Sequence, residues 1–349
     1  MKPHSLTRRD LLIAATATSL PARGQLTCDA KGLLTPYKLN KLIVAGSGNG
    51  GEFDSQSADC PFVFQHERKF YMTYVGFDGI GYQTGLASSG DLITWKKEGC
   101  IVQRDPTSPI TKYNVAMNWI MRENKLHSPG RLTTVGGEYI GAYHAYPNAG
   151  YESGAAVIGL CRSKDLRHWK LDPPCLTPDQ GADWERGGLY KPCLLKYQGR
   201  FYLFYNAKDH TIGSWNEQTG VATSPDLKTW TRYAGNPVIR NGPAGAPDSW
   251  FASDPCVLKN GREWAMFYFG RDKTGCRELV ATSPDLFHAN KCNEILIDMG
   301  LPGSVDSSFA HKPSLVAHRS ALYHFYCAVS KKEGKEVRGI SVARSTPWT

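Results

Sequence analysis

The sequence lacks any apolar run long enough to cross a bilayer, since the stretch after Arg9 ends by Leu20 and no later run approaches about 20 residues. It also lacks a cluster of lysines and arginines, although the formal net charge of the 349 residues is +9. Nucleic-acid-binding proteins concentrate such residues on one face. No low-complexity linker divides the chain. We therefore expect one domain, without a nucleic-acid or membrane partner.

Zinc-site spacing is absent too, because no CxxC pair and no Cys/His cluster occurs. We expect no cofactor, and the sequence leaves a structural calcium ion as an open alternative. Ten cysteines in a chain with an export signal favour disulfides. Five lie near expected loops and are disulfide candidates: Cys28, Cys100, Cys175, Cys276 and Cys292. Four lie on expected strands and are predicted to be small apolar core residues: Cys60, Cys193, Cys256 and Cys327.

The first residues read as a targeting signal. Arg8 and Arg9 directly precede a short apolar stretch, and small residues follow near Ala22. We expect residues 1–24 to be a twin-arginine signal peptide and residues 25–349 to be the exported domain, periplasmic or extracellular. Removal of residues 1–24, with four basic residues and one acid, leaves a net charge of +6. An acidic glycan partner is compatible with that charge.

One pattern recurs along the whole chain. In this pattern a charged residue, usually an acid, lies seven positions before a proline. The proline then begins an apolar run. The clear copies run from Asp54 to Pro61, from Asp248 to Pro255 and from Asp306 to Pro313; the degenerate ones run from Glu185 to Pro192 and from Arg122 to Pro129. An aromatic strand follows each proline, at residues 70–74, 139–143, 201–205, 266–268 and 323–326.

A second marker closes the repeat. Asp-Leu pairs begin at Asp91, Asp165, Asp226 and Asp285, at a period of roughly 60 residues. We expect these aspartates to stabilise turns, with the tryptophans that follow packing between sheets. Such spacing predicts an all-β, five-bladed β-propeller. Residues 37–44 resemble residues 95–102, so we expect the N-terminal segment to pair with the last blade and close it. A β-sandwich is the alternative.

In a propeller the strands opened by proline lie innermost, so two rings of polar residues should face the axis. The outer ring is Asp54, Arg122, Glu185, Asp248 and Asp306, and the ring next to the prolines is Asp59, His127, Lys191, Asp254, His311 and Lys312. Burying several carboxylates together raises some of their pKa values, while neighbouring lysines and arginines keep others ionised, as acid–base catalysis needs. The alternative is that the repeated Asp-Ser pairs cap turns.

These motifs together resemble the five-bladed propeller glycoside hydrolases, including families 43, 117, 130 and 32. The resemblance to family 43 implies that Asp59 is a base and Glu185 an acid. The resemblance to family 117 implies instead Asp59, Asp254 and a histidine acid, His311. Family 130 contains phosphorylases, for which Arg131, Lys191 and Lys312 would bind phosphate.

We therefore expect a glycoside hydrolase that cleaves plant or microbial oligo- or polysaccharides with inversion, using paired carboxylates. Its alternatives are a phosphorylase of the same fold and a non-catalytic carbohydrate-binding propeller. The predicted catalytic residues are Asp59, Glu185, Asp254 and His311, with the acid either Glu185 or His311. The predicted substrate-binding residues are Asp54, His127, Arg131, Trp184, Lys191, Asp248, Trp250 and Asp306. The two tryptophans are chosen because each lies within two residues of an inner acid.

Overall fold

The computed structural model describes residues 28, 30–211 and 215–348, so the expected signal peptide lies outside the described residues. Within these residues the regular structure is β-strand, with three short 3-10 turns and no α-helix: η1 (Lys31–Leu33), η2 (Pro178–Gln180) and η3 (Asp183–Glu185). The all-β prediction is confirmed. None of the helices in the described part of the chain has the length and apolar character that crossing a bilayer requires.

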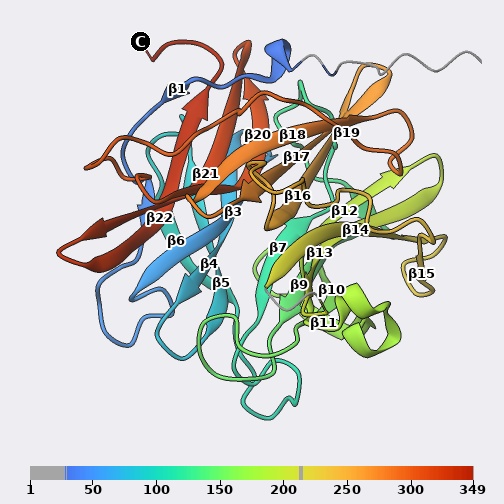
Figure 1. The fold of residues 1–349 in the computed structure, drawn as a ribbon. Coiled ribbons are helices and arrows are strands. Elements are labelled where there is room, and N and C mark those ends of the chain that lie inside the picture. The colour runs from blue at the N-terminus through green and yellow to red at the C-terminus, as the bar shows by residue number, and fades with distance from the viewer. Residues whose placement is uncertain (1–27, 29, 212–214, 349) are drawn as a thin grey trace, which may run out of the picture.

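The strands form five successive antiparallel units, which we call blades one to five (Figure 1). Blade one holds β3 (Ser57–His66), β4 (Lys69–Phe77), β5 (Tyr82–Ser89) and β6 (Lys96–Val102). Blade two holds β7 (Ala116–Ile120), β8 (Thr134–Val135), β9 (Glu138–Ala145), β10 (Val157–Ser163) and β11 (Lys170–Leu176). Blade three holds β12 (Leu189–Tyr197), β13 (Arg200–Asp209), β14 (Asn216–Ser224) and β15 (Thr231–Arg232).

Blade four holds β16 (Phe251–Asn260), β17 (Glu263–Arg271), β18 (Cys276–Ser283) and β19 (Asn290–Lys291), and blade five holds β20 (Phe309–His318), β21 (Ala321–Lys332) and β22 (Lys335–Arg344). The first strands contact one another in cyclic order: β3 with β7, β7 with β12, β12 with β16, β16 with β20, and β20 with β3. They are buried along most of their length. Because both faces of these strands are buried, their sequences are apolar runs and do not alternate between apolar and polar residues.

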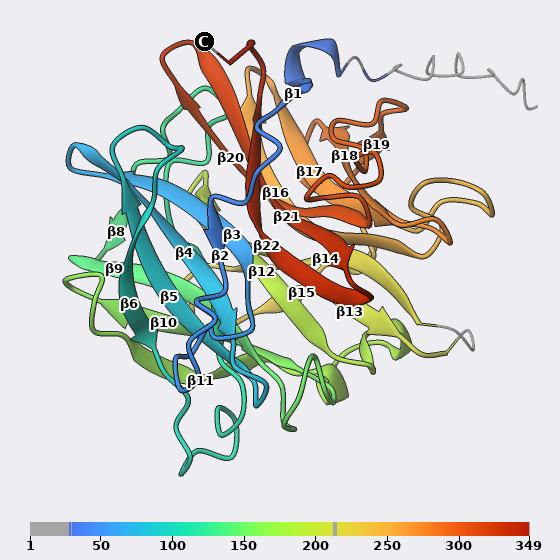
Figure 2. The ribbon, with the colours of Figure 1, turned by 90° about the vertical axis from the view of Figure 1, so that its left-hand side faces the viewer.

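Two short N-terminal strands lie beside the last strand of blade five (Figure 2). They are β1 (Tyr37–Lys38) and β2 (Val44–Ala45), both antiparallel to β22. Val44 pairs with Ile340, and the N–H of Ile43 donates to the carbonyl of Ile340 at 2.8 Å. The segment that we expected to reach the last blade therefore does pair with it.

The Asp-Leu markers form turns, as predicted. Asp91 Oδ1 accepts the N–H groups of Ile93 and Thr94 at 2.8 and 2.7 Å, and the other three markers repeat these bonds. Trp95 meets Phe325 edge-on, with 5.9 Å between ring centroids. That tryptophan therefore packs between blades one and five.

The acid of the outer ring has a structural role that the sequence interpretation missed. In blades one, three, four and five its carboxylate binds a tyrosine twenty residues later and one cation. The clusters are Asp54 with Tyr74 and Lys97, Glu185 with Tyr205 and Arg232, Asp248 with Tyr268 and Lys291, and Asp306 with Tyr326 and Lys38. In blade five the cation comes from β1, whereas blade one uses β6 and blade four uses β19. In blade five the N-terminal segment thus supplies the cation that a later strand of the same blade supplies in blades one and four.

Each proline-opened strand carries a bulge at the residue before the proline. Cys60, Lys191, Asp254 and Lys312 have φ values of 49°, 52°, 55° and 70°, and the strand register shifts at each. A left-handed conformation costs a non-glycine residue on the order of 1 kcal/mol. A bulge re-aims side chains, and here it turns them toward the axis. With Asn118 of blade two they surround a small space of about 30 Å³; we call these five residues the axial ring.

The described residues contain one disulfide, between Cys28 and Cys292. The other three disulfide candidates, Cys100, Cys175 and Cys276, carry free thiols. The four cysteines predicted as core residues are free and buried, which confirms that prediction. The bond ties the segment before η1 to the loop after β19, across 264 residues of sequence.

Replacing both Cys28 and Cys292 by serine is expected to lower the free energy of unfolding by about 2–5 kcal/mol, because a long loop of the unfolded chain is no longer closed. Urea unfolding of the oxidised protein measures this. Cys100→Ser is the matched control, since Cys100 is a half-buried free thiol. Equal stability of the double variant and the control would show that the bond does not form.

Candidate active site

A cavity of about 250 Å³ opens at one end of the first strands, and the axial ring forms its floor. We call it the axial cavity. Three blades supply most of its wall. The lining residues are Tyr151, Glu152, Tyr190, Lys191, Asn206, Trp215, Glu217, Phe251, Asp254, Phe269, Arg271, Cys276, Phe309, His311, Lys312 and Arg338. Such a concave site with convergent charged groups is the usual form of an active site.

Glu217 lies at the start of β14 and is only 4% exposed. Its Oε2 accepts from Ser253 Oγ at 2.6 Å and from Asn206 Nδ2 at 3.1 Å. Trp215 Nε1 donates to its Oε1 at 3.0 Å. Burial raises the pKa of Glu217 to about 7, with nearby carboxylates adding to the shift against the effect of Lys208. A carboxyl group that keeps its proton near neutral pH is suited to general acid catalysis.

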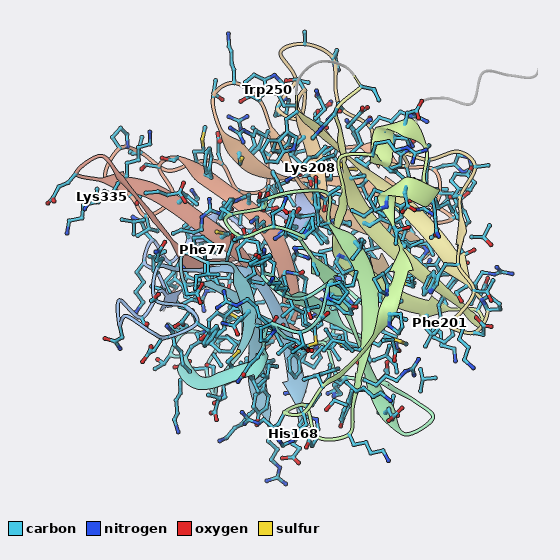
Figure 3. All side chains as sticks on the ribbon, turned by 90° about the horizontal axis from the view of Figure 1, so that it is seen from below. Phe77, His168, Phe201, Lys208, Trp250 and Lys335 are labelled. Atoms are coloured by element: carbon cyan, nitrogen blue, oxygen red, sulfur yellow. A yellow bond between two sulfur atoms is a disulfide. The ribbon has the colours of Figure 1, made fainter. Side chains whose placement is uncertain are left out.

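Glu152 has the opposite electrostatic environment. It lies in the loop between β9 and β10, and its Oε2 is 3.3 Å from Lys208 Nζ. Burial alone would raise the pKa of Glu152, but Lys208, Lys312 and Lys191 outweigh it and the pKa is lowered. Lys208 also stands 4.0 Å from the Trp215 ring and acts on the charge of Glu217. Figure 3 shows Lys208 near the middle of the molecule. The cavity thus holds one carboxyl group that favours the acid form and one that favours the base form.

Two aspartates complete the acidic groups. Burial raises the pKa of Asp254 to about 6, although Lys191 and Lys312 act against the shift. Asp59 is held by Lys312 Nζ at 2.7 Å and Arg338 at 2.9 Å. Burial alone would raise the pKa of Asp59, yet these two cations hold it well below its usual range. Asp59 is therefore the ionised partner of Lys312 and Arg338, and it does not line the cavity itself.

His311 lines the axial cavity but does not suit the predicted role of acid. Its Nδ1 donates to the carbonyl of Cys327 at 3.0 Å, and its Nε2 faces the Arg338 guanidinium at 3.4 Å. Burial, together with Lys312 and Arg338, lowers the pKa of His311 well below its ordinary value. The imidazole is neutral, and its remaining nitrogen has no proton to give.

The residues match the glycosyl hydrolases family 32 N-terminal domain over positions 121–297, half of the chain. The chain belongs to this family. A curated relative, the levanase of Bacillus subtilis (strain 168), is 28% identical over 203 residues, which are 55% of this chain and 28% of the levanase. The chain therefore spans little more than a quarter of that relative's length.

Two solved structures resemble almost the whole of this family 32 protein. One, a complex of BT0996 with RGII, is 29% identical with a TM-score of 0.79, and the match covers 91% of this protein and 94% of BT0996. The other, a glycoside hydrolase, is 28% identical with a TM-score of 0.80 at the same coverage. Structures from families 130, 117 and 43 are 16, 15 and 18% identical and share the fold alone. The predicted resemblance to the propeller glycoside hydrolases is confirmed, and the propeller fold follows from these neighbours.

The family 32 fold brings only some predicted site residues together. Lys191, Asp254 and His311 line the axial cavity, and Asp59 lies directly behind it. Trp250 is 43% exposed beside Arg271 and does not line it, as its outer position in Figure 3 illustrates. Phe251, the next residue, does.

The outer-ring acids lie outside the axial cavity. Asp54, Asp248 and Asp306 were expected to bind substrate, and Glu185 to share a pocket with Asp59 and Asp254. None lines the axial cavity. Their carboxylates instead form the hydrogen bonds and ion pairs of the tyrosine–cation clusters described above. Trp184 stacks on Tyr205 with 6.3 Å between ring centroids and packs there instead of lining the cavity.

His127 and Arg131 also lie away from the axial cavity. The N–H of Leu126 donates to the carbonyl of Lys259, near the β16–β17 turn, and Arg131 pairs with Gln65 near the end of β3. Both places lie at the far ends of strands whose starts face the cavity. In blade two, Pro129 follows the first strand β7 and does not open it, so the predicted position of that strand was wrong.

Glu152, Glu217 and Lys208 were missed by the sequence interpretation, which looked for acids only before the first strands. Glu217 begins a third strand, and Glu152 lies in a loop without a repeat partner. A signal that was available is the polar start of β14, Asn216-Glu217, in a strand that is buried along most of its length.

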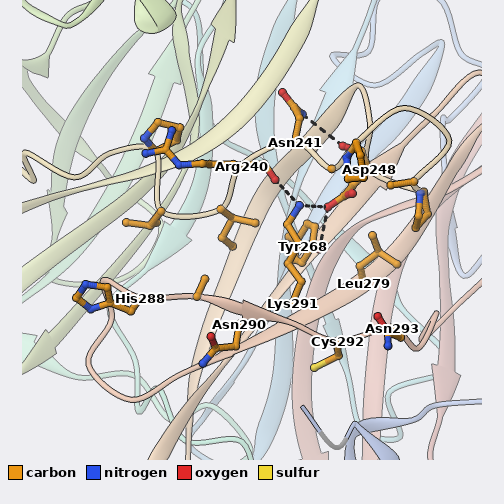
Figure 4. A pocket seen from close by; sticks show the side chains of 18 of the residues that line it. Arg240, Asn241, Asp248, Tyr268, Leu279, His288, Asn290, Lys291, Cys292 and Asn293 are labelled. Carbon is orange, nitrogen blue, oxygen red and sulfur yellow. Dashed lines mark hydrogen bonds and ion pairs between the residues drawn. The ribbon is translucent and has the colours of Figure 1, made fainter. Parts of the chain in front are cut away.

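A larger hollow of about 890 Å³ lies beside β18 and β19 (Figure 4). Asp248 is the only carboxylate among its lining residues, and Lys291 and Tyr268 bind it. This hollow therefore has no acid–base pair. Asp59, His311 and Cys327 also bring possible metal ligands within 4.8 Å of one another. Lys312 and Arg338 already neutralise that aspartate, so we do not assign a metal there.

Proposed function

We propose that the protein is a glycosidase whose reaction takes place in the axial cavity, with Glu217 as general acid and Glu152 as its ionised partner. The observation that carries this proposal is the opposite pKa shift of these two glutamates, a raised one at Glu217 and a lowered one at Glu152. Paired carboxyl groups held in different protonation states are the machinery of glycoside hydrolysis. A carbohydrate-binding propeller without activity has no need of that pair.

We propose the inverting form of the reaction. Glu217 protonates the leaving oxygen, and Glu152 removes a proton from the attacking water. Proton NMR of the first-formed product tests this, since inversion gives the anomer opposite to that of the substrate. A product with the anomeric configuration of the substrate would make Glu152 the nucleophile, and the axial cavity would remain the proposed active site.

The cavity also favours removal of sugars from the end of a glycan. The space that the axial ring and its prolines surround is only about 30 Å³, which is too small to hold a sugar unit. At the mouth, Tyr151 and Trp215 are 43 and 45% exposed and present flat apolar faces to further sugar units. The BT0996 match covers nearly the whole of this protein, whereas the levanase match covers about half of it. Oligosaccharides derived from RGII are therefore the first substrates to screen, with levan and aryl furanosides beside them.

The rate should depend on pH through both glutamates. Glu217 must be protonated, so kcat/KM is expected to fall as the pH rises through about 7. Glu152 must be ionised, and its lowered pKa places the acidic limb below its ordinary value of 4.5. A plateau between these limits is expected in a pH–rate profile of kcat/KM. Activity that stays constant up to pH 9 would exclude Glu217 as the acid.

Phosphorolysis is the competing reaction, since Lys191, Lys312, Arg338 and Arg271 all line the cavity. We propose hydrolysis because three of these four already have a partner: Asp59 holds Lys312 and Arg338, and Lys191 contacts the sulfur of Cys60. Assays with and without inorganic phosphate separate the two reactions.

We further propose that residues 25–349 form one catalytic domain, a five-bladed propeller closed by β1 and β2, and that residues 1–24 direct its export. The Cys28–Cys292 disulfide supports export, because such bonds persist in oxidising compartments. Fractionation of cells expressing the full chain, against an Arg8→Lys/Arg9→Lys variant, tests the route. Accumulation of both forms in the same compartment would reject it.

A further inference from the structure

We infer that Arg271 binds an oxyanion carried by the substrate, the carboxylate of a uronic acid unit, so that the enzyme acts on acidic glycans. This inference rests on the proposed function of the axial cavity. Arg271 is the last residue of β17 and lines the cavity. Of the cations that line it, Arg271 alone makes no ion pair with a described residue and contacts no cysteine sulfur. Its Nε is buried without a hydrogen-bond partner.

Aromatic rings hold the Arg271 guanidinium in place. Its Cζ lies 5.8 Å from the centroid of Trp250, 5.1 Å from Phe251 and 5.5 Å from Phe309. Rings against the faces of a guanidinium leave its edges free, and those edges offer two parallel N–H bonds to a carboxylate. Arg271 is half-buried among these rings, and the lower local dielectric strengthens its attraction for an anion. A neutral sugar would leave this cation desolvated and uncompensated.

The position fits a sugar unit next to the bond that is cleaved. In the sheet, Phe251 pairs with Glu217 on one side and with Arg271 on the other. Arg271 is thus two strand spacings from the proposed acid, about 10 Å across the sheet from backbone to backbone. That separation places the oxyanion on a unit beside the reacting one rather than on the reacting carbon. The acidic unit would therefore determine specificity without taking part in proton transfer.

The test compares one oligosaccharide substrate in two forms, with its uronic acid intact and with the carboxylate reduced to an alcohol. Wild type is expected to cleave the acidic form about 10- to 100-fold better in kcat/KM, as charge-assisted hydrogen bonds allow. Arg271→Gln should lose that preference, so that its kcat/KM values on the two forms become similar, and Arg271→Lys should keep part of the preference. Arg344→Gln is the matched control, because Arg344 stacks on Trp348 at 4.4 Å outside the cavity. Equal losses on both forms would overturn the inference.

A binding measurement separates this inference from the proposed function. Thermal unfolding of wild type and Arg271→Gln is recorded with D-galacturonate, D-galactose, galactose 6-sulfate or inorganic phosphate. Stabilisation of wild type alone by galacturonate supports the inference even if no tested glycan is hydrolysed. Stabilisation by the sulfate ester alone identifies that ester as the oxyanion source. Stabilisation by phosphate alone, or by no probe, contradicts a sugar-borne oxyanion.

Discussion

Glu217→Gln is expected to lower kcat on a natural glycan by about a hundredfold to ten-thousandfold. The amide keeps the shape and can still bond Ser253 and Asn206, but it has no acidic proton to deliver. Because the carboxyl group is hydrogen-bonded in place on β14, KM should change little. Steady-state kinetics of purified wild type and variant measure both constants. A variant with more than half of the wild-type kcat would remove Glu217 from the mechanism.

Glu185→Gln is the matched control for this result. Glu185 is 1% exposed and lies between Tyr205 and Arg232, so the amide leaves Arg232 without its carboxylate. The expected effect is a loss of stability of about 3–5 kcal/mol, typical of a broken buried ion pair, with kcat unchanged in the folded fraction. If Glu185→Gln abolished turnover in a protein of native stability, the acid would lie in that cluster and not in the axial cavity.

Glu152→Gln should also lower kcat by about a hundredfold or more, for a different reason. Glu152 supplies an ionised carboxylate that Lys208 keeps charged, and an amide can neither take a proton from water nor attack carbon. Loss of this charge also removes one carboxylate that raises the pKa of Glu217. The residual activity should therefore show its alkaline limb at lower pH than wild type.

The control for Glu152 is Glu123→Gln. Glu123 pairs with Arg131 at 3.6 Å, at the opposite end of the first strands. It is expected to leave kcat and the pH profile unchanged. Turnover of Glu152→Gln equal to that of this control would assign the base to another carboxylate of the cavity, Asp254.

Much of the fold was predictable because the turns and bulges that define each repeat depend on residues close together in the sequence. The Asp-Leu turns bond their own backbone over two or three residues. The prolines at Pro61, Pro192, Pro255 and Pro313 mark the first strands because each follows a bulge. Even the long-range pairing of the N-terminal segment with β22 was visible, because residues 37–44 repeat the fourth-strand pattern of blade one. Only the first strand of blade two was placed wrongly, because β7 lacks that proline.

The candidate site was harder to predict. A repeat identifies residues that all blades have in common, whereas the site residues Glu152 and Glu217 each occur in one blade only. The repeated acid has a structural role. Its tyrosine partner recurs twenty residues later and could have been recognised in the sequence, at Tyr74, Tyr205, Tyr268 and Tyr326. Glu152 and Glu217 come from a loop and a third strand that meet only in the folded molecule. The roles of Asp59 and His311 depend on Arg338, which is 279 and 27 residues away from them.

The most direct test of the central claim, that Glu217 in the axial cavity is the proton donor, is a comparison of leaving groups. Wild type, Glu217→Gln and Glu185→Gln are assayed on an alkyl glycoside and a 4-nitrophenyl glycoside of the same sugar. A nitrophenolate leaves with little protonation, so Glu217→Gln should lose about a hundredfold or more on the alkyl substrate and far less on the aryl one. Glu185→Gln should keep the wild-type ratio of the two rates. Equal losses of Glu217→Gln on both substrates, or the selective loss appearing in Glu185→Gln, would contradict the account.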